Sequence, residues 1–366
     1  MYAPHRHRSR LLGPAVALAA TSLLATACGS DGSDDAPEVA VAIDQERCET
    51  NREAGAVTFV TGYHYQASVT QLEVIAADAL GYFDALCLDV EIQPGNGDLM
   101  GNAQLVSAGT AQFTAMSNEA EVLQANARDH EIVGIATYGH VPISTLITGP
   151  EVEDLTELEG RTLGHQSMLP APLEAMLVEA GVDIDAIEQV EAGYDPSVLP
   201  RDQVQALTGF RSNEPHRLDA LDAEYTEWHP EDFGIVGSFG VLVTSPAWAE
   251  QHPTAVEDFL RAVGRAFDHC QGDGAECVDH AADLDRAGYD GEHNLKVWDT
   301  ERELVVSSTP GGEPRGFVDL DLTRQEARTL VDNGELDEVP EVAPLFDSRH
   351  LMAVHDGADL VWPDGE

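Results

Sequence analysis

From residue 55 onward, short hydrophobic runs alternate with longer amphipathic stretches. Apolar and β-branched runs predict strands at residues 57–60, 88–92, 111–115 and 132–136. Apolar positions at helical spacing predict helices over residues 69–80, 100–108 and 119–127. Strands that alternate with helices in this way indicate βαβ units, and therefore a mostly parallel sheet flanked by helices.

A second series of the same kind begins near residue 161. Its predicted strands lie at residues 161–164, just before Val190 and at 204–207, and its predicted helices at 170–180 and 215–221. A strand at 239–244 and a helix at 254–267 follow, and beyond Gly272 the pattern changes to helices and acidic loops. Two successive sheets with a return to the first predict an α/β fold of two lobes joined by two crossing hinge strands. The hinge candidates are residues 143–148 and 235–241.

The cleft between two such lobes is the candidate site, because parallel α/β sheets bind ligands at the carboxyl ends of their strands. The sequence contains no G-x-S-x-G, H-E-x-x-H or P-loop motif, which argues against an enzyme built on one of those sites. The histidines show no metal-ligand spacing. We therefore expect a binding protein without metal or cofactor. A glycosidase-type carboxylate pair stays open, since acidic residues are so abundant.

The N-terminus has the pattern of a secretory signal. Arg6, Arg8 and Arg10 precede an apolar stretch over residues 11–24, and small residues lead to Cys28. This ending resembles the bacterial lipoprotein signal, so we expect residues 1–27 to be removed and Cys28 to be lipidated. Ordinary cleavage after Ala27 and an uncleaved anchor are the alternatives. Residues 28–54 would then form an acidic flexible tether that holds the protein at the outer face of the cell membrane.

Net charge excludes two classes of partner. Lys and Arg number 19 against 66 Asp and Glu, which gives a net charge of −47. Such a surface repels phosphate backbones and anionic lipids, so we expect no nucleic acid and no membrane contact beyond the lipid anchor. The 43% of hydrophobic residues lie in periodic runs, so the chain can build a core and is not disordered.

Four cysteines remain if Cys28 is lipidated. An even number outside the cytoplasm favours disulfides. Of three connectivities we favour Cys48–Cys87 together with Cys270–Cys277, the latter across a short Gly/Asp loop. Zinc is the alternative, but the pairs lack C-x-x-C spacing and no histidine cluster accompanies them.

Several segments resemble motifs of a known family. Residues 77–85 and 88–92 are similar to its "GYF…GLDVE" stretch, and later motifs are matched at residues 105–113, 154–164, 208–215 and 252–260. Together they resemble the extracytoplasmic solute-binding proteins of ABC importers, in the branch for sulfonates, nitrate and the pyrimidine precursor of thiamine. The chain departs from the pattern at residues 202–206 and by placing Tyr63 or Tyr65 where tryptophan is frequent. These departures bear on the substrate more than on the fold.

The resemblance implies a periplasmic-binding-protein type II-like fold. Lobe 1 would span residues 55–147 and lobe 2 residues 148–235, while residues 236–366 return to lobe 1 and add a C-terminal helical extension. It also implies a monomer that is not an enzyme. Such a protein binds a small molecule and delivers it to ABC permease and ATPase subunits.

Candidate ligand-binding residues of the first lobe follow its predicted strands. Tyr63, His64 and Tyr65 come after the first strand, where an aromatic ring would stack on a flat heterocycle. Asn118 follows the third strand and Tyr138 the fourth. A tyrosine that only packs against a helix and an asparagine that only caps one are the structural alternatives.

In the second lobe, Gln166 and Ser167 precede a helix that starts with proline, and Tyr194 lies in a loop. The resemblance places Asn213 and Glu214 at the cleft, where the carboxylate would accept N–H bonds from an aminopyrimidine or a flavin ring. A helix N-terminal acid favoured by the dipole is the alternative for Glu214. We expect a thiamine pyrimidine precursor or a riboflavin-like vitamin as ligand. The alternatives are an alkyl sulfonate or nitrate and, from other classes, a secreted hydrolase or a structural surface lipoprotein.

Overall fold

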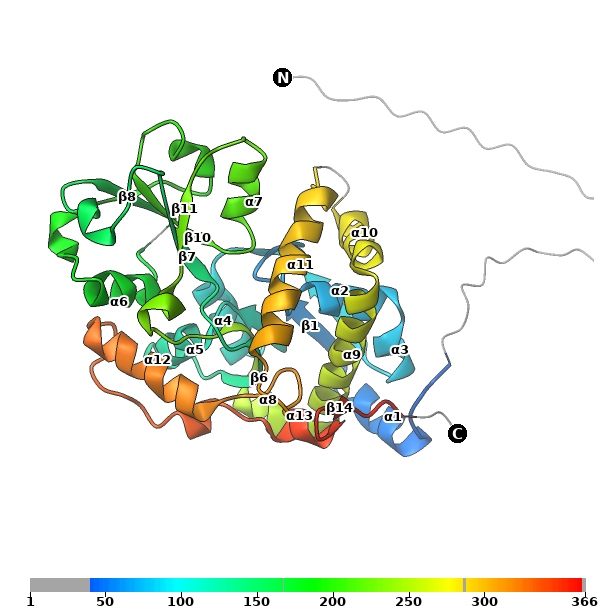
Figure 1. Ribbon diagram of the computed structural model, residues 1–366. Coiled ribbons are helices and arrows are strands. Elements are labelled where there is room, and N and C mark those ends of the chain that lie inside the picture. Colours follow the sequence, from blue (N-terminus) through cyan, green and yellow to red (C-terminus); the bar gives the residue numbers. More distant parts are fainter. Residues whose placement is uncertain (1–39, 167, 286–287, 364–366) are drawn as a thin grey trace, which may run out of the picture. The chain divides into compact units, whose positions relative to one another are not determined.

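The computed structural model describes residues 40–166, 168–285 and 288–363 (Figure 1). The expected signal segment, Cys28 and Ser167 lie outside the described residues. In the part of the chain that the structure describes, no helix combines the length and the apolar character needed to cross a membrane.

The first sheet has the strand order β3-β1-β5-β12-β6. Its strands are β1 (Ala56–Val60), β3 (Asp89–Gln93), β5 (Phe113–Met116), β6 (Val133–Gly139) and β12 (Phe239–Thr244). β1 pairs in parallel with β3 and β5, whereas β12 runs antiparallel to its neighbours β5 and β6. The expected strands are all present, and the last of them has the predicted bounds.

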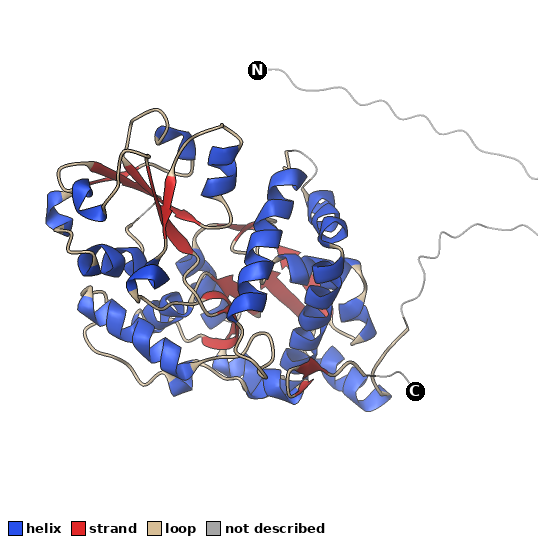
Figure 2. Cartoon of the chain, viewed as in Figure 1, coloured by secondary structure: helices blue, strands red, loops and turns tan. Residues whose placement is uncertain are grey.

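The second sheet has the order β11-β7-β10-β8-β9. Its strands are β7 (Ser144–Thr148), β8 (Thr162–His165), β9 (Glu188–Glu191), β10 (Ala206–Phe210) and β11 (Thr226–Trp228). β8 is parallel to β9 and β10, and β7 is the strand that runs against its neighbours. Both sheets are therefore mostly parallel, as the sequence predicts. Figure 2 shows their strands as two separate groups with helices around each.

The chain passes from the first sheet to the second between Gly139 and Ser144, and it returns between Phe233 and Phe239. These short crossings overlap the hinge candidates, but residues 144–148 and 239–241 of the candidates are strands inside the sheets. β7 belongs to the second sheet, which therefore begins before the expected lobe boundary at residue 148.

The core of the first lobe centres on the long helix α9 (Pro253–Gly272). Its Phe259 stacks on Phe113 with ring centroids 4.0 Å apart and on Phe83 at 5.3 Å. α9 packs against α2 (Leu72–Ala79), α3 (Tyr82–Ala85) and α10 (Gly274–Leu284). The first lobe is thus assembled from distant parts of the chain.

The other helices complete the two lobes. α11 (Gly291–Ser308) packs against β6 of the first lobe and against α7 (Glu214–Asp219) of the second. The remaining elements are α4 (Leu99–Ser107), α5 (Glu119–Ala127), α6 (Ala171–Glu179), α8 (Pro246–Gln251), α12 (Leu320–Asp332), α13 (Arg349–Ala353) and the short pairs β2 (Tyr63–His64) with β4 (Gly95–Asn96) and β13 (His355–Asp356) with β14 (Asp359–Leu360).

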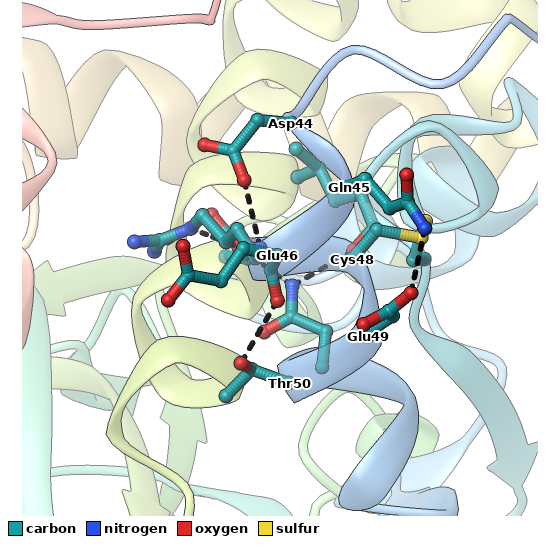
Figure 3. Close-up of a disulfide and its surroundings, with 11 residues drawn as sticks. Asp44, Gln45, Glu46, Cys48, Glu49 and Thr50 are labelled. Carbon is teal, nitrogen blue, oxygen red and sulfur yellow. Dashed lines mark hydrogen bonds and ion pairs between the residues drawn. A yellow bond between two sulfur atoms is a disulfide. The ribbon is translucent and has the colours of Figure 1, made fainter.

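Both expected disulfides are present, as Cys48–Cys87 and Cys270–Cys277. Cys48 lies in α1 (Gln45–Glu53), which begins at the capping carboxylate of Asp44 (Figure 3). The expectation of a flexible tether up to residue 54 is therefore wrong for its last part.

Long-range contacts explain why residues 45–53 are ordered. Arg47 Nε donates to the buried Asp258 Oδ2 at 2.7 Å, and Arg47 Nη2 bonds Glu257 Oε2 at 2.8 Å. Asn51 Nδ2 lies 2.6 Å from Asp258 Oδ2 and 2.8 Å from Leu86 O. These contacts and the disulfide hold α1 on the first lobe, although its own sequence is strongly polar.

The two disulfides should differ in their effect on stability, because they close loops of different length. Cys48 and Cys87 are 39 positions apart, and Cys270 and Cys277 are 7 apart. Replacing the first pair by serine should lower the free energy of unfolding by about 4 kcal/mol, and replacing the second pair by about 2 kcal/mol. Urea denaturation of both double variants measures the two losses. A larger loss for the Cys270–Cys277 pair would contradict the loop-length argument.

Candidate functional site

A cavity of about 470 Å³ lies where the carboxyl ends of the two sheets meet. Its first-lobe lining includes the segment after β1 and the end of β5, and its second-lobe lining includes residues that follow β8, β9 and β10. The two reversed strands contribute at their start, through Phe239 and Gly240 of β12 and through Ile143, just before β7. The cavity is therefore where the rule for parallel α/β sheets predicts a ligand.

Aromatic rings from both lobes lie at the cavity. Tyr63 and Tyr194 have ring centroids 6.0 Å apart and planes inclined by 29°. Both residues are accessible to solvent: Tyr63 is 41% exposed and Tyr194 is 60% exposed. The rings of His64 and Tyr63 are nearly perpendicular, with centroids 4.6 Å apart. These rings offer stacking faces to a planar ligand.

Glu214 is the central polar group of the second-lobe wall and is only 1% exposed. Its Oε2 accepts the Phe210 N–H at 2.7 Å, and its Oε1 accepts the side-chain amides of Asn213 at 2.8 Å and Gln166 at 3.3 Å. Burial raises the pKa of Glu214, and these hydrogen bonds act in the opposite direction. Gly209 makes room for this side chain, because a Cβ there would lie 2.8 Å from Glu214 Oε2.

Helix α11 supplies a wall that the sequence did not predict. Glu301 Oε1 accepts the Ser212 hydroxyl at 2.6 Å, and its Oε2 accepts the Val69 N–H at 2.7 Å. Burial raises the pKa of Glu301 to about 7. Nearer the start of the same helix, His293 Nε2 lies 2.7 Å from Asn213 Oδ1. Burial lowers the pKa of His293 to about 4, so the ring is neutral near pH 7 and Nε2–H donates to the amide oxygen.

Two further carboxyls belong to the first lobe. Glu121, at the start of α5, lines the cavity and accepts the Ser117 N–H at 2.7 Å, and burial raises its pKa to about 7. Glu73 of α2 is fully buried and is not part of the cavity lining, and no side-chain donor or cation among the described residues contacts its carboxyl group. Burial raises the pKa of Glu73 to about 8, and the charge of Glu301 adds to the rise.

Most sequence-predicted ligand-binding residues lie together at this cavity. They are Tyr63, His64, Tyr65, Gln166, Tyr194, Asn213 and Glu214. Their role in binding stays a prediction.

Tyr138 and Asn118 are placed elsewhere, so for them the predicted position at the cleft is wrong. Tyr138 is 2% exposed and packs in the core near Phe267, with ring centroids 6.1 Å apart. Asn118 caps α5, because its Oδ1 accepts the Glu121 N–H. In both cases the structural alternative, packing or capping, describes the residue.

Sequence reasoning missed other lining residues, among them Gln71, Glu121, Tyr289, His293, Asn294 and Glu301. Gln71 Oε1 accepts the N–H groups of Gly62 and Tyr63 at 3.0 and 3.3 Å, so it shapes the loop that carries the aromatic residues. Glu121 follows a predicted strand, which was a usable signal. The residues on and before α11 carried none, because they lie beyond the part of the chain with the family motifs.

A family model described as NMT1/THI5 like matches residues 68–276. No curated protein matches the chain. Among solved structures, the alkanesulfonate-binding protein SsuA from Xanthomonas axonopodis pv. citri, bound to MOPS, is 13% identical with a TM-score of 0.58, over 80% of this chain and 98% of that one. The periplasmic aliphatic sulphonate binding protein SsuA from Escherichia coli is 12% identical with a TM-score of 0.58, over 84% and 94%.

The desulfurization enzyme DSZB has a similar fold, with 14% identity and a TM-score of 0.55 over 81% of this chain and 98% of that one. At these identities the likeness concerns the fold alone. It confirms the expected two-lobed fold of periplasmic binding proteins, and the family match confirms the resemblance found in the sequence.

The buried carboxyls predict how stability depends on pH. A carboxyl whose pKa is higher in the folded than in the unfolded protein binds more protons when folded, so stability falls as pH rises between the two pKa values. For Glu73 this window runs from 4.5 to about 8. Glu73→Gln removes the ionisable group while keeping the shape of the side chain. The free energy of unfolding of the variant, relative to that of the wild type, should therefore increase from pH 5 to pH 8. The growth is bounded by about 1.4 kcal/mol per pH unit.

Urea denaturation at several pH values measures this difference. Glu53→Gln, at an exposed position of α1, is the matched control and should show the same dependence of stability on pH as the wild type. A constant difference between Glu73→Gln and the wild type across this range would show that Glu73 is not held protonated by burial.

Proposed function

The chain belongs to the NMT1/THI5 like family, and we propose that it is the solute-binding protein of an ABC importer. It binds a small aromatic nitrogen heterocycle between its two lobes, such as a thiamine pyrimidine precursor or a riboflavin-like vitamin. It does not transform this ligand but delivers it to permease and ATPase subunits. Lipidated Cys28 anchors the monomer at the outer face of the cell membrane.

The placement of Glu214 is the observation that carries the proposal. The residue lines the cavity, is almost fully buried and is bordered by the amides of Asn213 and Gln166. Each carboxylate oxygen can accept two hydrogen bonds, and Oε2 accepts one from the protein. The side chain therefore retains capacity for an N–H group of a ligand, while the two amides offer further donors and acceptors.

The aromatic residues supply the second requirement of a flat ligand. Tyr63 and Tyr194 come from different lobes and present their rings at the same cavity. A heterocycle stacked on either ring gains about 0.5–1.5 kcal/mol beyond the burial of its area. Because the two rings belong to different lobes, a ligand that contacts both favours the arrangement in which the lobes are close.

The sulfonate-binding proteins of similar fold define the competing ligand class. A sulfonate is an anion that requires cationic or N–H donors, whereas a nitrogen heterocycle also uses acceptors. Isothermal titration of the purified protein with riboflavin, a 4-aminopyrimidine and an alkanesulfonate separates these classes. Turnover of any of the three would favour an enzyme, as in DSZB, over a receptor.

Variants at the cavity test the placement of the ligand. Glu214→Gln should weaken binding of the preferred heterocycle roughly ten- to hundredfold, because a charge-assisted hydrogen bond is lost. Glu188→Gln, an exposed acid of the same lobe, is the matched control and should leave affinity unchanged. Tyr63→Ala should weaken binding about three- to tenfold through lost stacking, and Tyr63→Phe should retain it. Unchanged affinity in both Glu214→Gln and Tyr63→Ala would place the ligand elsewhere.

A further inference from the structure

Five acidic side chains line the cavity, and for three of them, the glutamates Glu121, Glu214 and Glu301, every hydrogen-bond donor is neutral. Glu121, Glu214 and Glu301 accept hydrogen bonds from backbone N–H groups, side-chain amides and a serine hydroxyl, all of which are neutral. No ion pair to these three carboxyls is found among the described residues. Buried charges in proteins are normally paired, because an unpaired one keeps its full desolvation cost.

The rest of the lining compensates for this charge only in part, through Arg217, whose charge lowers the pKa of Glu214. Arg217 is the one arginine or lysine among the described lining residues, and it is exposed with its Nε bonded to Asn213 Oδ1 at 3.3 Å. His293 is neutral near pH 7, as its lowered pKa requires. Asp285 and Asp290 add two more acids to the lining. Acidic side chains therefore outnumber cationic ones among the described lining residues.

A second feature of the cavity points to a polar ligand. Tyr289 lines it, and the buried hydroxyl of Tyr289 has no hydrogen-bond partner among the described residues. A buried hydroxyl that is left unpaired is costly, so the wall of the cavity retains one unsatisfied polar group. The aromatic pair Tyr63–Tyr194 adds two ring faces, which attract cations through their π electrons.

We propose that the cavity selects a positively charged ligand, with Glu121 and its neighbouring carboxyls as the groups that recognise the charge. The inference rests on the proposed function, since it names the charge of the heterocycle that the receptor binds. A cation supplies further counter-charge, stabilises the ionised form of these carboxyls and donates charge-assisted hydrogen bonds to them. Burial already disfavours the charged form of these carboxyls, as their raised pKa values reflect. An anionic ligand would add electrostatic repulsion to this cost.

A series of three ligands on one ring tests the proposal without any variant. The ring is 4-aminopyrimidine, which carries at position 5 an aminomethyl, a hydroxymethyl or a carboxylate group, so that the substituent is positive, neutral or negative at pH 7.5. Isothermal titration should find the aminomethyl compound roughly ten- to hundredfold tighter than the hydroxymethyl compound. The carboxylate should be weaker still.

Glu121→Gln then assigns the effect to a residue. It should reduce the preference for the aminomethyl over the hydroxymethyl compound at least severalfold, measured as the ratio of the two dissociation constants in the same variant. Glu131→Gln is the control, because it removes one exposed acid of the same lobe outside the cavity and should keep the preference of the wild type. Thermal unfolding checks that the variants are folded. If Glu121→Gln does not fold, the three-ligand series with the wild-type protein tests the proposal by itself.

The outcomes separate the two proposals. If none of the three compounds binds, the heterocycle assignment fails. If the ring binds but the hydroxymethyl or carboxylate compound binds as tightly as the aminomethyl compound, the charge proposal fails and the receptor proposal stands. Tight binding of an alkanesulfonate with no binding of the pyrimidines would overturn both the heterocycle assignment and the charge proposal.

Discussion

The direction of two strands determines where the rest of the structure can place a ligand. β6 ends at the carboxyl edge of the first sheet, and the next strand, β7, begins at the carboxyl edge of the second. A chain that leaves one edge and enters the facing edge must run antiparallel to the strands it joins. The same holds for the return into β12. The two reversed strands thus turn both carboxyl edges toward one space, which the cavity occupies.

The sheets were predictable because their signals are local. Strand runs such as residues 239–244 are read from a few neighbouring side chains, and the disulfides were predicted from the even number of cysteines that the expected export leaves. The α1 helix was not predictable in this way, because Arg47 and Asp258 lie 211 positions apart and the helix has little apolar surface of its own. The predicted positions of Tyr138 and Asn118 were wrong for a related reason. β6 continues to Gly139, so Tyr138 is a strand residue packed in the core, while Asn118 caps α5, and only the packed chain decides between these positions and the cleft.

Charge has different consequences at the surface and in the cavity. With 66 acids and 19 bases, solvated carboxylates dominate the chain and water screens most of them. Several arginines are held in ion pairs away from the cavity, such as Arg47 with Asp258 and Arg211 with Glu231. Glu121, Glu214 and Glu301 receive neutral donors only. The abundance of acidic residues at the surface says little about function. The carboxyls of the cavity are informative, because they are removed from water.

Glu301 is hydrogen-bonded to both lobes at once. Its two oxygens accept from Ser212, which follows β10, and from Val69, which precedes α2. If the lobes separate, one oxygen exchanges a protein donor for water, and the carboxyl becomes easier to ionise. A separation of the lobes at Glu301 would then be accompanied by the loss of a proton near neutral pH, so pH would influence the relative position of the two lobes.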